Sequence, residues 1–475
     1  MSMKQGDILK LKIDNVAAGG EGVARHDGMA VFVEGALPGE EAECRIIFLK
    51  QNYAKAKILK LTKSSPDRVV PPCKIYDLCG ACQLQHISYK KQLDIKTKIV
   101  KDNLSKIGGI NPDVVLDCIG MEKPWGYRNK MQYPVRKSKI PSTKFNINSK
   151  YKTPNSKQDI AIGYYKKGTH DVVEVEDCPV LHPSLNELAR AVRFAVNDAH
   201  IPPYDEDSGR GVLRHILART AFKTGEGLLC FVINSKELNG SKYIIGNILK
   251  KLDNYHGFRL KGVSKNLNTR MTNVILGEYT NNVWGSTYIQ EKLGTLLLEL
   301  SVDSFFQVNP VQSEILYDTV KKYADSDKND VIVDAYCGIG SIALWLAAAA
   351  KEVYGIEENR AAINDAQANS KLNNIRNAHF DCGKVERVLY DYFRSGLKPS
   401  IIILDPPRSG CEAKTLESAI KMRPKKIIYV SCDSATLARD LKILSQGYKI
   451  RRVQPVDMFP QTSHVESVVL LESKA

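Results

Sequence analysis

The last third of the chain carries the pattern that most constrains its fold, a series of short apolar runs separated by segments of helical character. These runs are rich in Ile and Val and lie at residues 331–334, 352–356, 401–404 and 426–430. Unbroken apolar runs of this length are typical of parallel strands, because helices cover both faces of a parallel sheet. The pattern predicts an α/β fold for residues 296–475, a doubly wound, Rossmann-like domain.

The start of the chain has a different pattern, with short alternating strands and frequent turn residues. Residues 7–13 alternate apolar and polar side chains, and Asp27-Gly28 and Pro38-Gly39 mark turns between further short strands. Five such strands predict a small β-barrel over residues 1–62. Barrels of this size often bind RNA or oligonucleotides, although one that serves only as a packing module fits the same pattern.

Residues 63–295 mix strand and helix patterns without a clear period, which predicts an α+β central domain. A long amphipathic helix is expected near residues 89–107, closed by Gly108-Gly109. Packing of this helix against the C-terminal domain is one option that the sequence leaves open.

Charge and composition favour a polyanionic partner. Lys and Arg outnumber Asp and Glu by 68 to 53, which gives a formal net charge of +15 at pH 7. Residues 136–157 contain six Lys and one Arg without an acidic residue, so this stretch is a candidate for phosphate contacts or a solvated insertion. The N-terminus lacks the apolar core of a signal peptide, and no run approaches the roughly 20 apolar residues of a membrane span. We therefore expect a cytoplasmic protein whose 11 cysteines are thiols rather than disulfides.

A glycine-rich loop follows the first strand of the C-terminal domain. The segment 334–341 (DAYCGIGS) enters a helix, and Glu357 lies about 20 residues further on, where a carboxylate can bind ribose hydroxyls. This loop alone fits NAD and S-adenosylmethionine equally well. The strand at 401–404 ends in Asp405-Pro-Pro-Arg408, a rigid corner found in methyltransferases, which favours S-adenosylmethionine. The two prolines by themselves also fit an ordinary turn.

Cys432 follows the strand at 426–430 and is the candidate nucleophile. A helix that starts near Thr436 is expected to lower the pKa of this thiol and populate the thiolate. Taken alone, a buried structural cysteine is the commoner interpretation. A thiolate that adds to C6 of uracil makes C5 nucleophilic, so that C5 can accept a methyl group, and a base must then remove the C5 proton. Glu466, beside a final apolar strand, supplies that base.

Several segments together resemble the RNA 5-methyluridine methyltransferases, in particular the ribosomal-RNA branch that carries an iron–sulfur cluster. The N-terminus is similar to a TRAM domain, and the resemblance spans nearly the whole chain. The matching segments are 126–130 (GYRNK), 213–215 (LRH), 304–309 (SFFQVN), 405–408 (DPPR), 431–432 (SC) with 436–440, and 459–466 (FPQTSHVE).

The resemblance implies roles for individual residues. Cys432 would be the nucleophile and Glu466 the base, and the residues that would contact S-adenosylmethionine are Gln307, Tyr336, Glu357 and Asp405. The chain departs from the family in having Asp433-Ser434 where Asn-Pro is usual, and an extra carboxylate there is expected to oppose activation of the thiol. Ala335 in place of the usual Leu is expected to be harmless.

A cysteine cluster lies at the start of the central domain. Cys73, Cys79 and Cys82 form C-x5-C-x2-C, and the resemblance implies Cys178 as a fourth ligand. Four soft thiolates suit a [4Fe–4S] cluster or zinc, and the spacing leaves both open. The resemblance favours iron–sulfur, with a structural or RNA-positioning role rather than radical chemistry.

The resemblance also implies the partner. We expect a monomer, without a membrane partner, that methylates C5 of a uridine in RNA, with 23S ribosomal RNA favoured by the TRAM-like domain and the cysteines. The alternatives are the same chemistry on tRNA, a non-catalytic RNA-binding protein, and an NAD enzyme built on the glycine loop.

Overall fold

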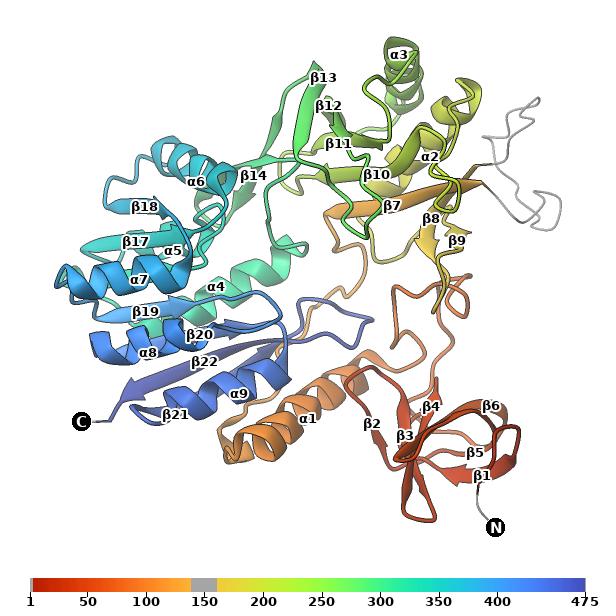
Figure 1. The fold of residues 1–475 in the computed structure, drawn as a ribbon, viewed down its shortest axis with the longest axis horizontal. Helices are drawn as coiled ribbons and strands as arrows, with labels where there is room; N and C mark the ends of the chain where they lie inside the picture. Colours follow the sequence, from red (N-terminus) through yellow and green to blue (C-terminus); the bar gives the residue numbers. More distant parts are fainter. Residues whose placement is uncertain (1–2, 138–159, 475) are drawn as a thin grey trace.

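The computed structural model describes residues 3–137 and 160–474 of the chain (Figure 1). Most of the basic stretch 136–157 therefore lies outside the described residues. Three sheets and a hairpin make up the β-structure, and no helix in the described part of the chain is long and apolar enough to cross a membrane.

The N-terminal sheet has six strands in the order β1-β5-β6-β4-β3-β2. Small apolar side chains such as Ala24, Val31 and Ala54 fill its interior. The two-residue β2, which pairs with β3, was not predicted. The strands are β1 Ile8–Lys12, β2 Asn15–Val16, β3 Gly22–His26, β4 Met29–Glu34, β5 Glu41–Leu49 and β6 Tyr53–Lys63.

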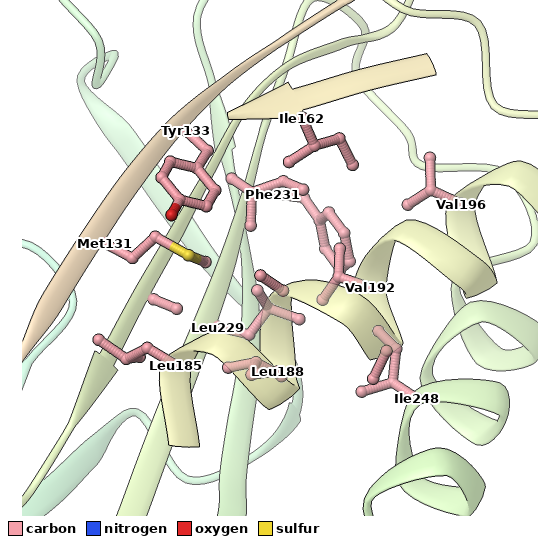
Figure 2. Packing of buried hydrophobic residues seen from close by; sticks show 14 of the residues in the cluster. Met131, Tyr133, Ile162, Leu185, Leu188, Val192, Val196, Leu229, Phe231 and Ile248 are labelled. Carbon is pink, nitrogen blue, oxygen red and sulfur yellow. The ribbon is translucent and has the colours of Figure 1, made fainter. Parts of the chain in front are cut away.

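The central sheet has seven strands in the order β13-β12-β11-β10-β7-β8-β9. Figure 2 shows Leu185, Leu188 and Val192 of α2 packed toward Leu229 and Phe231 of the sheet, because the apolar side chains of this helix lie on one face. The elements are β7 Lys130–Lys137, β8 Ile160–Tyr165, β9 Val172–Glu174, α2 Pro183–Asp198, β10 Leu213–Thr220, β11 Glu226–Ile233, α3 Ser241–Leu252, β12 Arg259–Leu267 and β13 Tyr279–Gly285.

A hairpin of β14 (Tyr288–Leu293) and β15 (Leu296–Ser301) lies where the sequence predicts a domain boundary, after residue 295. That boundary falls in the turn of the hairpin. The buried side chains of both strands, such as Ile289 and Leu298, belong to the core of the C-terminal sheet. The same core also contains Leu217 of β10 and Leu228 of β11, so the hairpin packs between the two sheets and the boundary remains a prediction.

The C-terminal sheet has the order β18-β17-β16-β19-β20-β22-β21, in which the first five strands are parallel and β22 runs antiparallel to both of its neighbours, β20 and β21. Helices α4 and α5 cover one face, and α7, α8 and α9 cover the other. This is the predicted doubly wound fold. Its elements are α4 Pro310–Ala324, β16 Val331–Ala335, α5 Ser341–Ala347, β17 Glu352–Glu357, α6 Arg360–Leu372, β18 Ala378–Cys382, α7 Val385–Arg394, β19 Ile401–Leu404, α8 Ala413–Met422, β20 Lys426–Ser431, α9 Ser434–Leu444, β21 Tyr448–Val456 and β22 Glu466–Ser473.

Helix α1 (Tyr89–Gly108) ends as predicted at Gly109, which adopts a left-handed conformation with φ of 65°. A one-turn helix, Pro112–Val114, follows it. The helix lies beside α9 (Figure 1), and Asn103 Nδ2 donates a hydrogen bond to Ser434 Oγ at 2.7 Å. The N-terminal third of the chain thus reaches the C-terminal domain.

Candidate active site

The carboxyl ends of the parallel strands β16, β17, β19 and β20 meet at one edge of the C-terminal sheet. Tyr336 follows β16, Glu357 ends β17, Asp405 follows β19 and Cys432 follows β20. Neighbouring strands align there, since Ala335 lies opposite both Ile356 and Leu404. Ligands of open α/β sheets bind at this edge, so the structure brings these four predicted residues to one place.

Glu466 reaches the same edge from the opposite direction. Antiparallel pairing sets Ser431 of β20 against Ser467 of β22, and the next pair in this register is Cys432 and Glu466. Residues directly opposite each other on antiparallel strands have Cα atoms about 4.5–5.5 Å apart. The thiol and the carboxyl group therefore lie on adjacent strand ends, although 33 residues of chain separate them.

The glycine loop between β16 and α5 provides open space for a ligand. Gly338 has φ of 54°, and a Cβ atom added to it would meet nothing within 4 Å. Its N–H donates to Glu357 Oε2 at 3.3 Å, and Gly340, with φ of 79°, begins α5. Tyr336 is also left-handed, with φ of 68°. A non-glycine residue rarely adopts this conformation, and such residues concentrate at functional sites.

Gln307 is buried just before α4, and its backbone is held by the central sheet. Asn129 Nδ2 donates to the carbonyl oxygen of Gln307 at 3.1 Å, and the backbone N–H of Asn129 donates to the carbonyl oxygen of Val308 at 2.8 Å. Sequence reasoning gave Asn129 no role, although it lies in the matched segment 126–130. The match was the signal that could have found it.

Three acidic groups lie near one another at the sheet edge. Burial, with a smaller contribution from Asp405, raises the pKa of Glu466 to about 8. Burial alone raises the pKa of Asp405 to about 7. Burial first, then Glu466 and Asp405, raise the pKa of Cys432 to about 12. The prediction that the helix N-terminus lowers the pKa of this thiol is wrong for this structure, because desolvation and two neighbouring carboxyl groups outweigh it.

Asp433 has a structural use that explains its presence beside the nucleophile. Its Oδ1 accepts hydrogen bonds from the backbone N–H groups of Ala435 and Thr436, both at 3.0 Å, so it is the N-cap of α9. Asp is as good an N-cap as Asn. The departure from the family pattern therefore preserves the cap.

Arg408 was not predicted to have a role, but its charge acts on two of the three acidic groups. It is exposed, and its Nη2 lies 3.5 Å from both ring nitrogens of His464. It lowers the pKa of both Cys432 and Glu466. The segment 405–408 was matched as a unit, so the same match that named Asp405 could have named Arg408.

The four predicted metal ligands line a single pocket. Cys73, Cys79 and Cys82 of one loop meet Cys178 there, together with Gln85, whose buried Oε1 has no hydrogen-bond partner in the described part of the chain. Within residues 3–137 and 160–474, no group of three His, Cys, Asp or Glu side chains is arranged to hold a metal ion. The structure thus gathers the thiols without showing coordination geometry.

Comparisons with known proteins agree with this architecture. Residues 250–474 match a family model described as tRNA (uracil-5-)-methyltransferase, and residues 3–59 match the TRAM domain. A Bacillus cereus protein called an uncharacterized RNA methyltransferase is 40% identical over 470 residues, which are 99% of this chain and 97% of that protein. One from Caldanaerobacter subterraneus is 41% identical and covers 99% of both chains.

A solved structure is similar over nearly the whole chain. The tRNA (uracil-54, C5)-methyltransferase of Pyrococcus abyssi, in complex with S-adenosyl-L-homocysteine, has a TM-score of 0.74 and 26% identity, covering 97% of this chain and 99% of that one. The fold and the residues at its sheet edge define a methyltransferase of the Rossmann-like class rather than an NAD enzyme. The chain belongs to the RNA uracil-5-methyltransferase family and carries a TRAM domain.

Proposed function

We propose that the protein transfers a methyl group from S-adenosylmethionine to C5 of a uridine in RNA through a covalent bond between Cys432 Sγ and C6. The observation that carries this proposal is the register of β20 against β22, which ends at the pair Ser431–Ser467 and so sets Cys432 and the buried Glu466 at adjacent strand ends. Gln307, Tyr336, Glu357 and Asp405 are the proposed cofactor contacts. Glu357 already orients the glycine loop and has the position expected of a ribose ligand.

The proposed reaction has three steps. The Cys432 thiolate adds to C6, and the electrons of the C5–C6 double bond move toward the ring carbonyl. C5 then bonds to the methyl carbon while the bond from that carbon to the sulfonium sulfur breaks. Glu466 finally removes the C5 proton, the double bond reforms and the thiolate leaves.

The resting pocket keeps the thiol neutral. With a pKa of about 12, on the order of one Cys432 in 10⁴ or 10⁵ is ionised near neutral pH. Asp405, whose pKa is about 7, is the nearby carboxyl group that accepts the thiol proton, and Glu466, whose pKa is about 8, must be ionised to take the C5 proton later. Attack by Cys432 therefore depends on an ionised carboxylate, and Arg408 stabilises the negative charge that the pocket holds.

This arrangement predicts that activity rises with pH. A raised carboxyl pKa means that the proton is lost only as pH approaches that value, so kcat/KM is expected to increase by about tenfold per pH unit from pH 6 to 7.5 and level off near 8. Arg408→Ala should move the rising limb to higher pH, because the lost positive charge lowers the pKa of Glu466 and of Cys432 in the wild type. Single-turnover methyl transfer between pH 6 and 9 measures this, and a flat profile would contradict it.

We further propose 23S ribosomal RNA as the substrate. The TRAM domain and the four-cysteine pocket support this choice, as the resemblance to the ribosomal branch implies. The similarity to the Pyrococcus abyssi tRNA methyltransferase and to the tRNA family model favours the second candidate, tRNA. Mapping 5-methyluridine in ribosomal RNA and tRNA from cells with and without the protein separates the two. A cytoplasmic, monomeric protein remains our prediction.

We also propose that the cysteine pocket holds a [4Fe–4S] cluster, with zinc as the alternative. Cys73, Cys79, Cys82 and Cys178 would supply an all-sulfur donor set, which suits either group. Bound there, the cluster would supply a structural cross-link between the cysteine loop and the segment of Cys178. The pocket is closed on its other sides by Tyr76, Tyr164 and Val175.

Protein purified anaerobically is therefore expected to be brown, with iron and acid-labile sulfide in near-equal amounts. Cys79→Ser should lose the colour and lower the melting temperature, because metal binding contributes folding free energy to a loop with little apolar burial. Metal analysis and absorption spectra test this. Stoichiometric zinc without sulfide would show that the pocket holds zinc instead of a cluster. Fresh anaerobic protein without any metal would contradict both the cluster and the zinc site.

A further inference from the structure

The segment that leads into Glu466 is held in an unusual backbone conformation. Residues 457–465, here called the base loop, connect β21 to β22, whose first residue is Glu466. Gln461 in this loop is 2% exposed and has φ of +72°. A left-handed non-glycine residue costs roughly 1–3 kcal/mol and persists only where its surroundings hold it. The contacts of Gln461 therefore indicate what fixes the path of the chain toward the base.

Gln92 of helix α1 holds Gln461 by two hydrogen bonds between the residues. The backbone N–H of Gln461 donates to Gln92 Oε1 at 3.1 Å, and Gln92 Nε2 donates to Gln461 Oε1 at 3.0 Å. Gln92 is 1% exposed, and its Nε2 also donates to the carbonyl oxygen of Ile87 at 2.9 Å. Both side chains are thus oriented by buried hydrogen bonds, which are costly to leave unmade.

The segment after Cys82 closes the other side of Gln461. The backbone N–H groups of Gln83 and Leu84 donate to the carbonyl oxygen of Gln461 at 3.2 and 3.0 Å. Gln83 Oε1 accepts from the backbone N–H of Ser463 at 3.4 Å. The backbone donor and acceptor of Gln461 are therefore both taken by residues 83–92, which precede it by more than 360 positions.

The first half of the base loop is also fixed, and Gln461 lies between this part and Glu466. Lys96 Nζ of α1 lies 2.5 Å from Asp457 Oδ1, with both side chains fully buried, and also donates to the carbonyl oxygen of Phe459 at 3.0 Å. Tyr127 OH donates to the carbonyl oxygen of Pro460 at 2.9 Å. A change at Gln461 must therefore be transmitted mainly toward His464 and Glu466.

We propose that Gln92 is a positioning residue for the methyl-transfer reaction: by holding Gln461 in its left-handed conformation, it sets the place of Glu466 relative to Cys432. The inference rests on the proposed role of Glu466 as the base. The N-terminal helix then contributes to proton abstraction without touching the RNA base. Loss of Gln92 should slow the step that needs Glu466 more than it weakens cofactor binding.

The test uses Gln92→Met in the full-length protein, since methionine keeps the length of the side chain and its fit to a helix. Proton removal is expected to slow roughly ten- to a hundredfold, so that denaturing gels show more covalent protein–RNA adduct than wild type. The dissociation constant for S-adenosylmethionine should change less than about threefold. In the double variant with Gln461→Gly, adduct should fall back toward wild type, because glycine adopts positive φ without a partner.

Thr97→Val is the matched control. Thr97 is a buried polar residue of the same helix, and its Oγ1 accepts from the backbone N–H of Cys118 at 2.9 Å without touching the base loop. This variant should lose stability without accumulating adduct. If Gln92→Met folds poorly, Gln83→Ala should give the same adduct to a smaller extent, because it removes the hydrogen bond from Ser463 together with the one that Gln83 Nε2 donates to the carbonyl oxygen of Gly80.

The outcomes separate the inference from its premise. Adduct in Glu466→Gln but none above wild type in Gln92→Met and Gln83→Ala would overturn the positioning role and leave the base in place. No adduct in Glu466→Gln would overturn the premise and the inference together. Equal adduct in Thr97→Val and Gln92→Met would show that any loss of helix stability has this effect, which also overturns the positioning role.

Discussion

Replacing Cys432 by alanine is expected to reduce methyl transfer on the order of 10⁴-fold or more, because a covalent route loses its first bond. Uracil C5 is too weak a nucleophile to displace the methyl group without prior addition at C6. The residues proposed for the cofactor lie at the ends of β16, β17 and β19 and in the segment before α4, so the dissociation constant for S-adenosylmethionine should stay within about threefold of wild type.

Transfer of labelled methyl groups to RNA under single-turnover conditions measures the loss, and calorimetry measures cofactor binding. Cys230→Ala is the control, since this thiol is buried and lies on β11 of the central sheet, away from the sheet edge. That variant should lose stability from a small cavity and keep its turnover. Activity of Cys432→Ala within tenfold of wild type would exclude the covalent mechanism.

The strands that could be placed well from the sequence are those buried on both faces. β16, β17, β19 and β20 begin where they were predicted and end within one residue of the predicted position, because helices on both sides require unbroken apolar runs. β18 and β21 were missed for a related reason. Both are edge strands, and polar residues such as His379 and Arg451 interrupt their apolar pattern. An edge strand faces solvent and so lacks the apolar signal.

The site was predictable as a set of residues but not as an electrostatic environment. Motif matches name Cys432 and Glu466, yet only the register of β20 against β22 sets them opposite each other. The predicted direction of the pKa shift of Cys432 was wrong, because the burial of this thiol and the carboxyl groups near it depend on strands that are distant in sequence. The hydrogen bonds between Gln92 and Gln461 could not be predicted for the same reason, since no local sequence pattern links two residues so far apart.

Glu466→Gln gives the second large expected effect, a build-up of covalent enzyme–RNA adduct. Glutamine keeps the shape of the side chain and cannot take the C5 proton, so the first two steps proceed and the third slows by about 10²- to 10⁴-fold. The variant should release methylated RNA slowly while the methyl group is already on C5. Denaturing gels with labelled RNA detect the adduct, and Glu472→Gln, at the exposed end of the same strand, should show none beyond wild type.

The pKa of Glu466 adds a stability test that distinguishes lost chemistry from lost structure. Its pKa is raised to about 8 in the folded protein from an ordinary value of 4.5, so the folded state holds the proton more tightly than the unfolded state. Below the unfolded pKa this group costs nothing, and its destabilising effect grows as pH rises from about 4.5 to 8. Glu466→Gln cannot ionise, so its melting temperature relative to wild type should rise between pH 5 and pH 8. A variant that melts lower than wild type at pH 8 and shows no adduct would mean that Glu466 serves the fold and not the proton.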